Sequence, residues 1–192
     1  MSDQPFAIVV VCVGNVCRSP LAERLLQRDF ESLLHQEDRP VVGSAGLGAL
    51  VGEPMNKLAA RELVRLGGDP AGFAARQVTP EILDGADLVL TATKQLRSRM
   101  LEETPRALKR TFTVRELSSI VSADDFWHLP AQGPRDLVQR AASLRGSAAP
   151  AAYDVTDPIG RSTAVHREVA EVLDEACRTI ARAVAQATFV TP

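Results

Sequence analysis

A cysteine and an arginine near the start of the chain are separated by five residues, in the string CVGNVCRS at positions 12–19. The apolar run before Cys12 predicts a buried strand, and Arg18 stands where a helix is expected to begin. A cysteine thiolate is a nucleophile that can attack phosphorus, and the planar guanidinium of arginine matches two phosphoryl oxygens. Cys12 and Arg18 are therefore candidate catalytic residues.

The residues that follow Cys12 form a candidate phosphate-binding loop. Successive backbone N–H groups in a loop of this length can turn inward around an anion, and the following helix adds its positive N-terminal end. The same positive environment favours the thiolate of Cys12, to which Ser19 can donate a hydrogen bond. We expect the phosphoryl group to be bound by Val13, Gly14, Asn15, Val16, Cys17, Arg18 and Ser19.

The residue types in this string support a loop. Gly14 permits unusual backbone angles, Asn15 tolerates a left-handed one, and Pro20 suits the first turn of a helix. The spacing of Cys12 and Arg18 alone is equally consistent with a buried cysteine followed by a surface arginine. The full string favours the functional interpretation.

Cleavage of a phosphate ester also needs an acid that protonates the leaving oxygen. Asp157 precedes Pro158, which disfavours helical backbone at the aspartate, and Ser162 can cap a helix that follows. Asp154 is a competing carboxylate, and an aspartate before a helix is often only a turn or cap residue. The residues alone leave both aspartates open.

The elements that would position these side chains alternate along the chain. Apolar runs and helical periodicity predict strands at 6–12, 41–44, 87–93 and 111–117, and helices from about 21 to 36 and at 55–66, 94–108 and 162–187. This order predicts an α/β fold: a single doubly wound domain, residues 1–192, with a four-stranded parallel sheet flanked by helices. The phosphate-binding loop would follow the first strand. Residues 118–153 read as an irregular, partly mobile insertion around a short helix at 135–144.

Composition sets further limits. A chain of 192 residues suits one domain, and a formal net charge of -2 gives no general attraction to nucleic acid or an anionic membrane. The longest apolar run, 6–13, is far too short to span a membrane, and the first residues lack a secretory pattern. Three cysteines without zinc spacing argue against a disulfide framework or a metal site. We expect a cytoplasmic protein with no nucleic-acid partner and no membrane insertion.

The string CVGNVCRSPLAE resembles the signature of the low-molecular-weight protein-tyrosine phosphatases. The similarity continues in SAGLGALVG at 44–52, ARQ at 75–77, DLVLT at 87–91 and the pair Asp157-Pro158. The stretch at 44–52 is particularly similar to bacterial members that act with tyrosine kinases of capsule and exopolysaccharide synthesis.

This resemblance implies an enzyme that hydrolyses phosphotyrosine in proteins through a phosphocysteine intermediate, without a metal or organic cofactor. It implies that Cys12 is the nucleophile, that Arg18 stabilises the transition state and that Asp157 is the general acid. A bacterial tyrosine kinase is the implied partner. The physiological substrate and the oligomeric state stay open.

The chain departs from the family around the substrate. Family members often follow Asp-Pro with an aromatic residue that flanks the substrate ring, whereas this chain has Ile159. Leu47 and Leu50 fall where the family's substrate wall maps, although ordinary core packing would explain them equally well. Members directed at phosphoarginine carry a threonine at the position of Val16, so phosphotyrosine is favoured. The predicted substrate wall is Leu47, Leu50 and Ile159.

Two other aspects stay open at this point. Cys17 can form a reversible disulfide with Cys12 that protects the nucleophile from irreversible oxidation, or it can be a small packing residue. Arsenate reductases share this fold and loop but need more distal cysteines than Cys177 alone. A phosphate-binding module without turnover would need no nucleophile.

Overall fold

A parallel sheet forms the centre of the molecule. The computed structural model describes residues 4–128, 131–146 and 152–189, and its strands are β1 (Ala7–Cys12), β2 (Val41–Gly46), β3 (Leu88–Thr91) and β4 (Thr111–Thr113). All the pairs are parallel and the order is β2-β1-β3-β4. The predicted four-stranded parallel sheet in a single α/β domain is confirmed.

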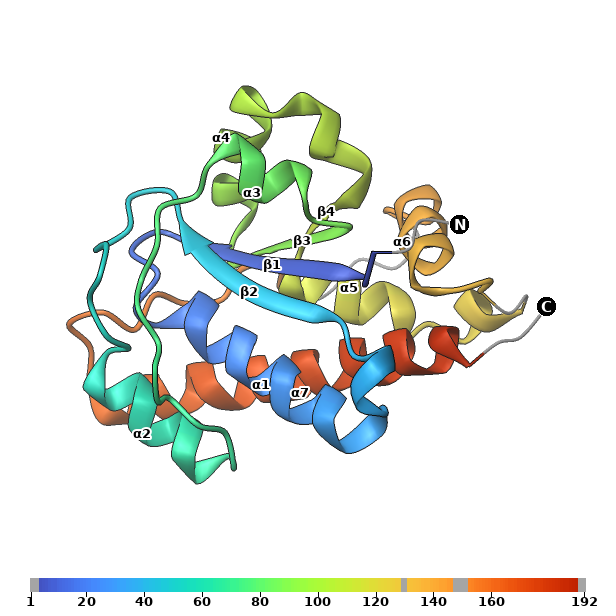
Figure 1. The fold of residues 1–192 in the computed structure, drawn as a ribbon. Helices are drawn as coiled ribbons and strands as arrows, with labels where there is room; N and C mark the ends of the chain where they lie inside the picture. The colour runs from blue at the N-terminus through green and yellow to red at the C-terminus, as the bar shows by residue number, and fades with distance from the viewer. Residues whose placement is uncertain (1–3, 129–130, 147–151, 190–192) are drawn as a thin grey trace.

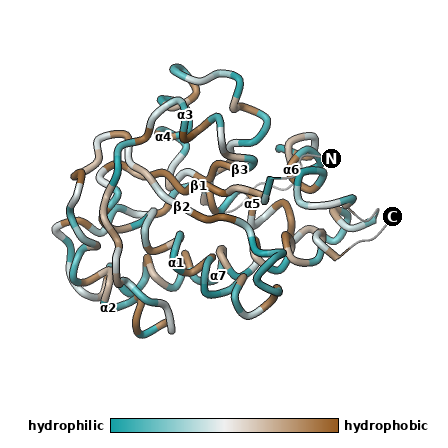
Figure 2. Tube along the Cα trace, in the orientation of Figure 1, coloured by the Kyte–Doolittle hydropathy of each residue, from teal (hydrophilic) through white to brown (hydrophobic). Residues whose placement is uncertain are grey.

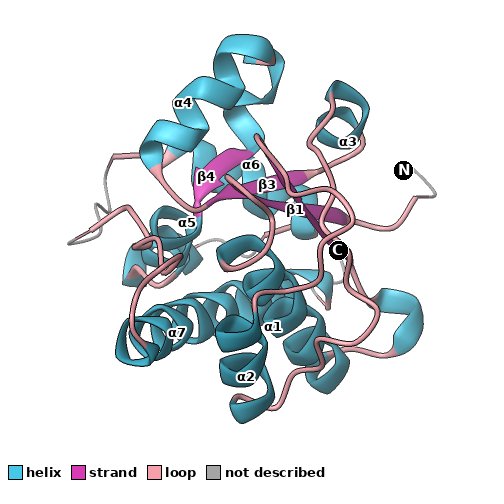
Figure 3. Ribbon diagram, turned by 90° about the vertical axis from the view of Figure 1, so that its left-hand side faces the viewer, coloured by secondary structure: helices cyan, strands magenta, loops and turns pink. Residues whose placement is uncertain are grey.

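Helices cover both faces of this sheet (Figure 1). Their bounds are α1 (Arg18–Leu33), α2 (Lys57–Arg65), α3 (Pro80–Asp84), α4 (Lys94–Glu103), α5 (Val114–Val121), α6 (Pro134–Ser143) and α7 (Thr163–Thr188), with short 3-10 turns at Gln36–Asp38, Pro105–Arg110 and Asp124–Trp127. Helices α1, α2 and α7 lie on one side of the sheet, and α3 and α4 lie on the other (Figures 1 and 3). The doubly wound arrangement follows from right-handed crossovers between parallel strands.

The core has two layers because successive side chains of a strand point to opposite faces. Ile8 and Val10 of β1 belong to the larger cluster, which they share with apolar residues of α1 and α7. Val9 and Val11 belong to a smaller cluster with Met100 of α4. All six residues of β1 are apolar, and the trace is accordingly brown along this strand (Figure 2).

Several predicted element boundaries need correction. The strand predicted at 111–117 ends at Thr113, because the Thr113 hydroxyl accepts from the backbone N–H of Glu116 and the Glu116 carboxylate accepts from that of Thr113. This capping box starts α5. The helix predicted at 94–108 ends at Glu103 and a 3-10 turn begins at Pro105, since proline lacks the N–H that would continue the helix. Helix α3 was not predicted.

The segment 118–153 is more regular than expected in its described part. It contains the end of α5, the turn at Asp124–Trp127 and α6, which confirms the short predicted helix to within one residue. Phe126 is buried, and the Trp127 ring N–H donates to the Val121 carbonyl at 3.0 Å. Phe126 belongs to the larger hydrophobic cluster and Trp127 packs against it, so these two apolar side chains attach the segment to the core. Residues 129–130 and 147–151 of the predicted insertion lie outside the described residues.

Candidate active site

The predicted loop lies at the carboxyl end of β1, where the chain turns from Cys12 into α1 at Arg18. Parallel α/β sheets place their ligand sites at this edge. Asn15 has a positive φ of 54°, as its tolerance of left-handed backbone predicted. Figure 3 views this edge, with the loops that follow the strands facing the reader.

The segment 47–56, which follows β2, binds the backbone carbonyl groups of the loop. Backbone N–H groups of Leu47, Gly48, Leu50 and Asn56 donate to the carbonyls of Cys12, Val13, Gly14 and Val16, respectively, at 2.8–3.1 Å. In a planar trans peptide the N–H points opposite to the C=O. Holding these carbonyls outward therefore turns the N–H groups of the following residues towards the interior of the loop, as an anion nest requires.

Buried polar side chains surround the candidate nucleophile. The Cys12 thiol lies 2.9 Å from the Ser19 hydroxyl oxygen. The Asn15 amide nitrogen donates to Ser19 at 2.9 Å and to the Ser44 hydroxyl oxygen at 2.8 Å. Asn15 and Ser19 are fully buried, so these bonds fix the loop from within.

Arg18 lies at the base of the site and is only 5% exposed. One guanidinium nitrogen donates to the Val155 carbonyl at 3.2 Å, and the other donates to the Asp157 carboxylate at 2.6 Å. The structure thus brings together an arginine and an aspartate that are 139 residues apart in sequence.

The two candidate acids have different surroundings. Asp157 faces Arg18, its side chain is half exposed, and its other oxygen accepts from the backbone N–H of Ile159 at 3.2 Å. Asp154 instead accepts from the backbone N–H of Lys94 at 2.8 Å, at the start of α4. A carboxylate is favourable at a helix N-terminus, which gives Asp154 a structural role.

A cavity of about 250 Å³ opens above the loop. Its lining is Cys12, Val13, Gly14, Val16, Cys17, Arg18, Gly48, Leu50, Asp157 and Ile159. Leu50 and Ile159 of the predicted substrate wall belong to it. Leu47 does not, because its side chain packs against Ala92 and Leu96 beside Cys12.

The other cysteines differ from Cys12 in their surroundings. Burial raises the pKa of Cys17 to about 12, and the neighbouring Cys12 and Asp157 add to this rise while Arg18 opposes it. Burial also raises the pKa of Cys177, a residue of α7 whose side chain lies in the hydrophobic core of the protein. Both are therefore protonated thiols at neutral pH. The redox role of Cys17 stays a prediction.

Sequence reasoning missed several residues that shape the loop: Glu23, Ser44, Gly46 and Arg76. Ser44 and Gly46 lie in β2, beside β1, and the backbone N–H of Arg76 donates to the Asn15 side-chain oxygen at 2.8 Å. Two signals could have found them. The parallel pairing of neighbouring strands brings the carboxyl end of β2 to the same edge as that of β1. All four residues also lie within the strings that resemble the phosphatase family, at 12–23, 44–52 and 75–77.

A parallel α/β sheet with a Cys-x5-Arg loop after its first strand, and an aspartate facing that arginine, has the layout of a cysteine-dependent phosphatase. The model of the low molecular weight phosphotyrosine protein phosphatase family matches residues 7–131. The chain belongs to this family.

Curated relatives and solved structures agree with this assignment. The low molecular weight protein-tyrosine-phosphatase Wzb of Escherichia coli K12 is 44% identical over 98 residues, which are 51% of this chain and 62% of that protein. The probable phosphatase EpsP of Ralstonia nicotianae is 31% identical over 119 residues, 62% of this chain and 77% of that one. The match thus spans about three fifths of the length of Wzb.

Among solved structures, the YwlE arginine phosphatase of Geobacillus stearothermophilus superposes with a TM-score of 0.69 at 26% identity. The superposition covers 93% of this chain and 92% of that protein.

Proposed function

We propose that this chain is a protein-tyrosine phosphatase that acts through a phosphocysteine intermediate. The observation that carries the proposal is that Cys12, Arg18 and Asp157 line the same cavity, together with the apolar side chains of Val16, Leu50 and Ile159. Phosphoryl transfer by covalent catalysis requires a nucleophile, a cation that stabilises the phosphoryl oxygens and an acid for the leaving group. Cys12, Arg18 and Asp157 are residues of these three kinds, and they line one cavity.

In the first step, the Cys12 thiolate attacks phosphorus, an S–P bond forms and the P–O bond to tyrosine breaks. The N–H groups of the loop and the Arg18 guanidinium stabilise the charge on the equatorial oxygens. The Arg18–Asp157 ion pair opens when phosphoryl oxygens take the place of the carboxylate. Once released from Arg18, the Asp157 carboxylate takes up a proton from solvent and donates it to the tyrosine oxygen as the P–O bond breaks.

In the second step, water attacks the phosphocysteine and the S–P bond breaks. Asp157 accepts the proton of this water, phosphate leaves and the Cys12 thiolate is restored. The same carboxyl group thus serves as acid and then as base.

The rim of the cavity supports phosphotyrosine as the substrate. Leu50 and Ile159 are 55% and 50% exposed and, with Val16, offer apolar contact to a phenyl ring. Phosphoarginine is the competing substrate, because the similar YwlE structure is that of an arginine phosphatase. A charged guanidinium would gain less than a phenyl ring from such a rim.

We further propose a cytoplasmic location and a phosphotyrosine protein of a bacterial exopolysaccharide kinase system as the substrate. The buried, unpaired thiols of Cys12, Cys17 and Cys177 suit a reducing compartment. Within the described residues, no helix is long and apolar enough to cross a membrane. The partner rests on the resemblance of residues 44–52 to bacterial members of that kind.

The test is phosphate release from phosphotyrosine and phosphoarginine peptides by the reduced protein. Cys12→Ser should abolish release from phosphotyrosine, and Asp157→Ala should slow it about 10²- to 10⁴-fold. Asp154→Ala should retain the rate to within a few-fold, because Asp154 caps α4.

Faster phosphate release from the phosphoarginine peptide than from the phosphotyrosine peptide would contradict the proposal that phosphotyrosine is the substrate. Tight peptide binding without release would indicate a binding module, and thiol consumption with arsenate would indicate a reductase.

A further inference from the structure

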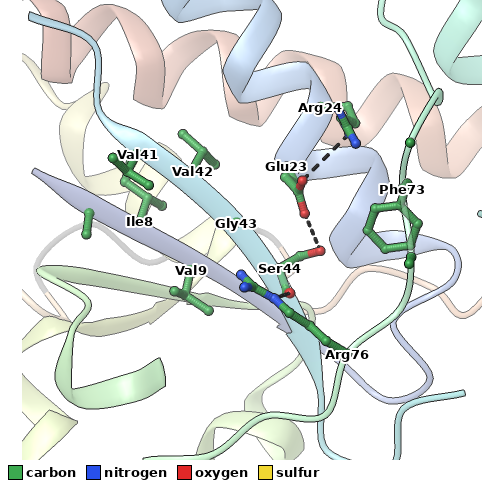
Figure 4. A pocket seen from close by; sticks show the side chains of 13 residues that line it. Ile8, Val9, Glu23, Arg24, Val41, Val42, Gly43, Ser44, Phe73 and Arg76 are labelled. Carbon is green, nitrogen blue, oxygen red and sulfur yellow. Dashed lines mark hydrogen bonds and ion pairs between the residues drawn. The ribbon is translucent and has the colours of Figure 1, made fainter. Parts of the chain in front are cut away.

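Beyond the three candidate catalytic residues, a buried glutamate is linked to the nucleophile. Glu23 of α1 is 8% exposed and its carboxylate accepts from the Ser44 hydroxyl at 2.5 Å. Figure 4 shows this contact at the wall of a cavity of about 350 Å³ between β2 and residues 72–76. The cavity lies apart from the one that Cys12 lines.

The direction of each hydrogen bond between Glu23 and Cys12 can be assigned. The backbone N–H of Arg76 can only donate, so the Asn15 atom that it contacts at 2.8 Å is the oxygen. The Asn15 nitrogen therefore faces both hydroxyl oxygens, of Ser19 and Ser44, and each accepts one of its hydrogens.

The hydroxyl protons follow from this assignment. Ser44 must direct its own proton elsewhere, and the Glu23 carboxylate, which when ionised only accepts, receives it. Ser19 likewise directs its proton away from Asn15, either to Cys12 at 2.9 Å or to the Ala45 carbonyl at the poorer distance of 3.4 Å. The bond to Cys12 stabilises the thiolate.

We infer that Glu23 is a positioning residue for the Cys12 thiolate, acting through the chain of buried side chains Ser44, Asn15 and Ser19. We call this chain of hydrogen bonds the relay. The ionised Glu23 carboxylate accepts the Ser44 proton, so the Ser44 oxygen is left to accept from Asn15. Asn15 also donates to Ser19, so the Ser19 hydroxyl proton is directed to the Cys12 sulfur. The inference deepens the proposed function and shares with it only the assignment of Cys12 as nucleophile.

A through-space effect of Glu23 would have the opposite sign. A negative charge disfavours a nearby thiolate, so its removal should promote ionisation of Cys12, whereas breaking the relay should hinder it. The other charged groups near Glu23 are Arg24 of α1, 3.6 Å from its carboxylate, and Arg76, which lines the same cavity. Near Cys12, Arg18, Asp157 and the protonated Cys17 line its cavity.

The test measures alkylation of Cys12 by iodoacetamide as a function of pH, read by mass spectrometry of the Cys12 peptide. Glu23→Gln should move the midpoint of the rate profile up by about 0.5–1 pH unit, the size of one modest hydrogen-bond effect. In a Ser44→Ala background, the same change should add almost nothing, because the relay is already broken. Glu31→Gln, on an exposed part of α1, should leave the profile unchanged.

A downward shift in Glu23→Gln, no shift, or an equal shift in both backgrounds would overturn the inference. If Glu23→Gln fails to fold, Ser44→Ala alone decides. It keeps the carboxylate and should move the midpoint upward, and an unchanged midpoint would contradict the relay. Because alkylation needs no phosphate ester, this outcome is independent of whether the chain hydrolyses phosphotyrosine.

Discussion

Gly46, at the end of β2, sets how closely that strand approaches the phosphate-binding loop. A Cβ at this position would lie 2.3 Å from the Val13 carbonyl oxygen and 3.0 Å from the Asn15 backbone nitrogen. Both neighbours are backbone atoms, so a side chain could be accommodated only if the loop itself moved. Glycine here is a requirement of close approach rather than of backbone angle.

At this residue scale we expect Gly46→Ala to lower kcat/KM for a phosphotyrosine peptide by about 10²-fold, because displacing catalytic groups by about 1 Å has an effect of that size. Gly85→Ala is the matched control. Its Cβ would lie 3.4 Å from the Glu81 carbonyl oxygen, an ordinary van der Waals contact, and Gly85 follows α3, outside the phosphate-binding loop. Wild-type kinetics in Gly46→Ala would contradict the steric argument, and Tm measurements would separate a loop effect from unfolding.

At the scale of elements, the start of α5 decides where the fourth strand ends. Thr113, Val114 and Leu117 are β-branched or apolar residues of the kind that favour a strand. The capping box of Thr113 and Glu116 nevertheless begins a helix. Glu116 is buried and also pairs with Arg97 at 2.5 Å. The box therefore connects α5 to α4 as well as defining its first turn.

We expect Thr113→Ala to lower the free energy of unfolding by about 1 kcal/mol, because it removes the hydroxyl that accepts from the Glu116 backbone N–H. Ser122→Ala at the exposed other end of α5 should change it by less than about 0.5 kcal/mol. Urea denaturation of both variants checks this, and equal effects would show that the cap contributes little.

At the scale of the whole molecule, two buried thiols link stability to alkaline pH. The pKa of Cys17 rises from 9.0 to about 12 in the folded protein, and burial raises that of Cys177 as well. Between about pH 9 and pH 12 the unfolded chain loses these protons and the folded protein keeps them. Stability is then lost as pH rises, since the unfolded state binds fewer protons.

The expected result is a urea midpoint that falls between pH 8.5 and 11, and falls less steeply in Cys177→Ala. Val184→Ala provides the control, because it removes buried volume from the same helix without removing an ionisable group. It should be less stable at every pH but keep the wild-type slope. The same slope in wild type and Cys177→Ala would contradict the role of burial.

Contiguous patterns in the sequence were enough to predict the phosphate-binding loop and most of the helices and strands. An apolar strand, the string from Cys12 to Ser19 and a following amphipathic helix carry enough local information to predict the phosphate-binding loop and the parallel sheet. The predicted end of the fourth strand at Leu117 was wrong, because the capping box of Thr113 and Glu116 outweighed the strand propensity of Thr113 and Val114. Strand propensity reflects packing context more than backbone preference.

Contacts between groups that are distant in the chain could be found only from the folded structure. Asp154 and Asp157 are three positions apart and chemically identical, and their separation into a helix cap and an Arg18 partner depends on how residues 154–157 pass over the sheet edge. Leu47 packs beside Cys12 instead of lining the cavity, for the same reason. Such contacts arise from the packing of segments far apart in the chain, which leaves no signal in the local pattern of residues.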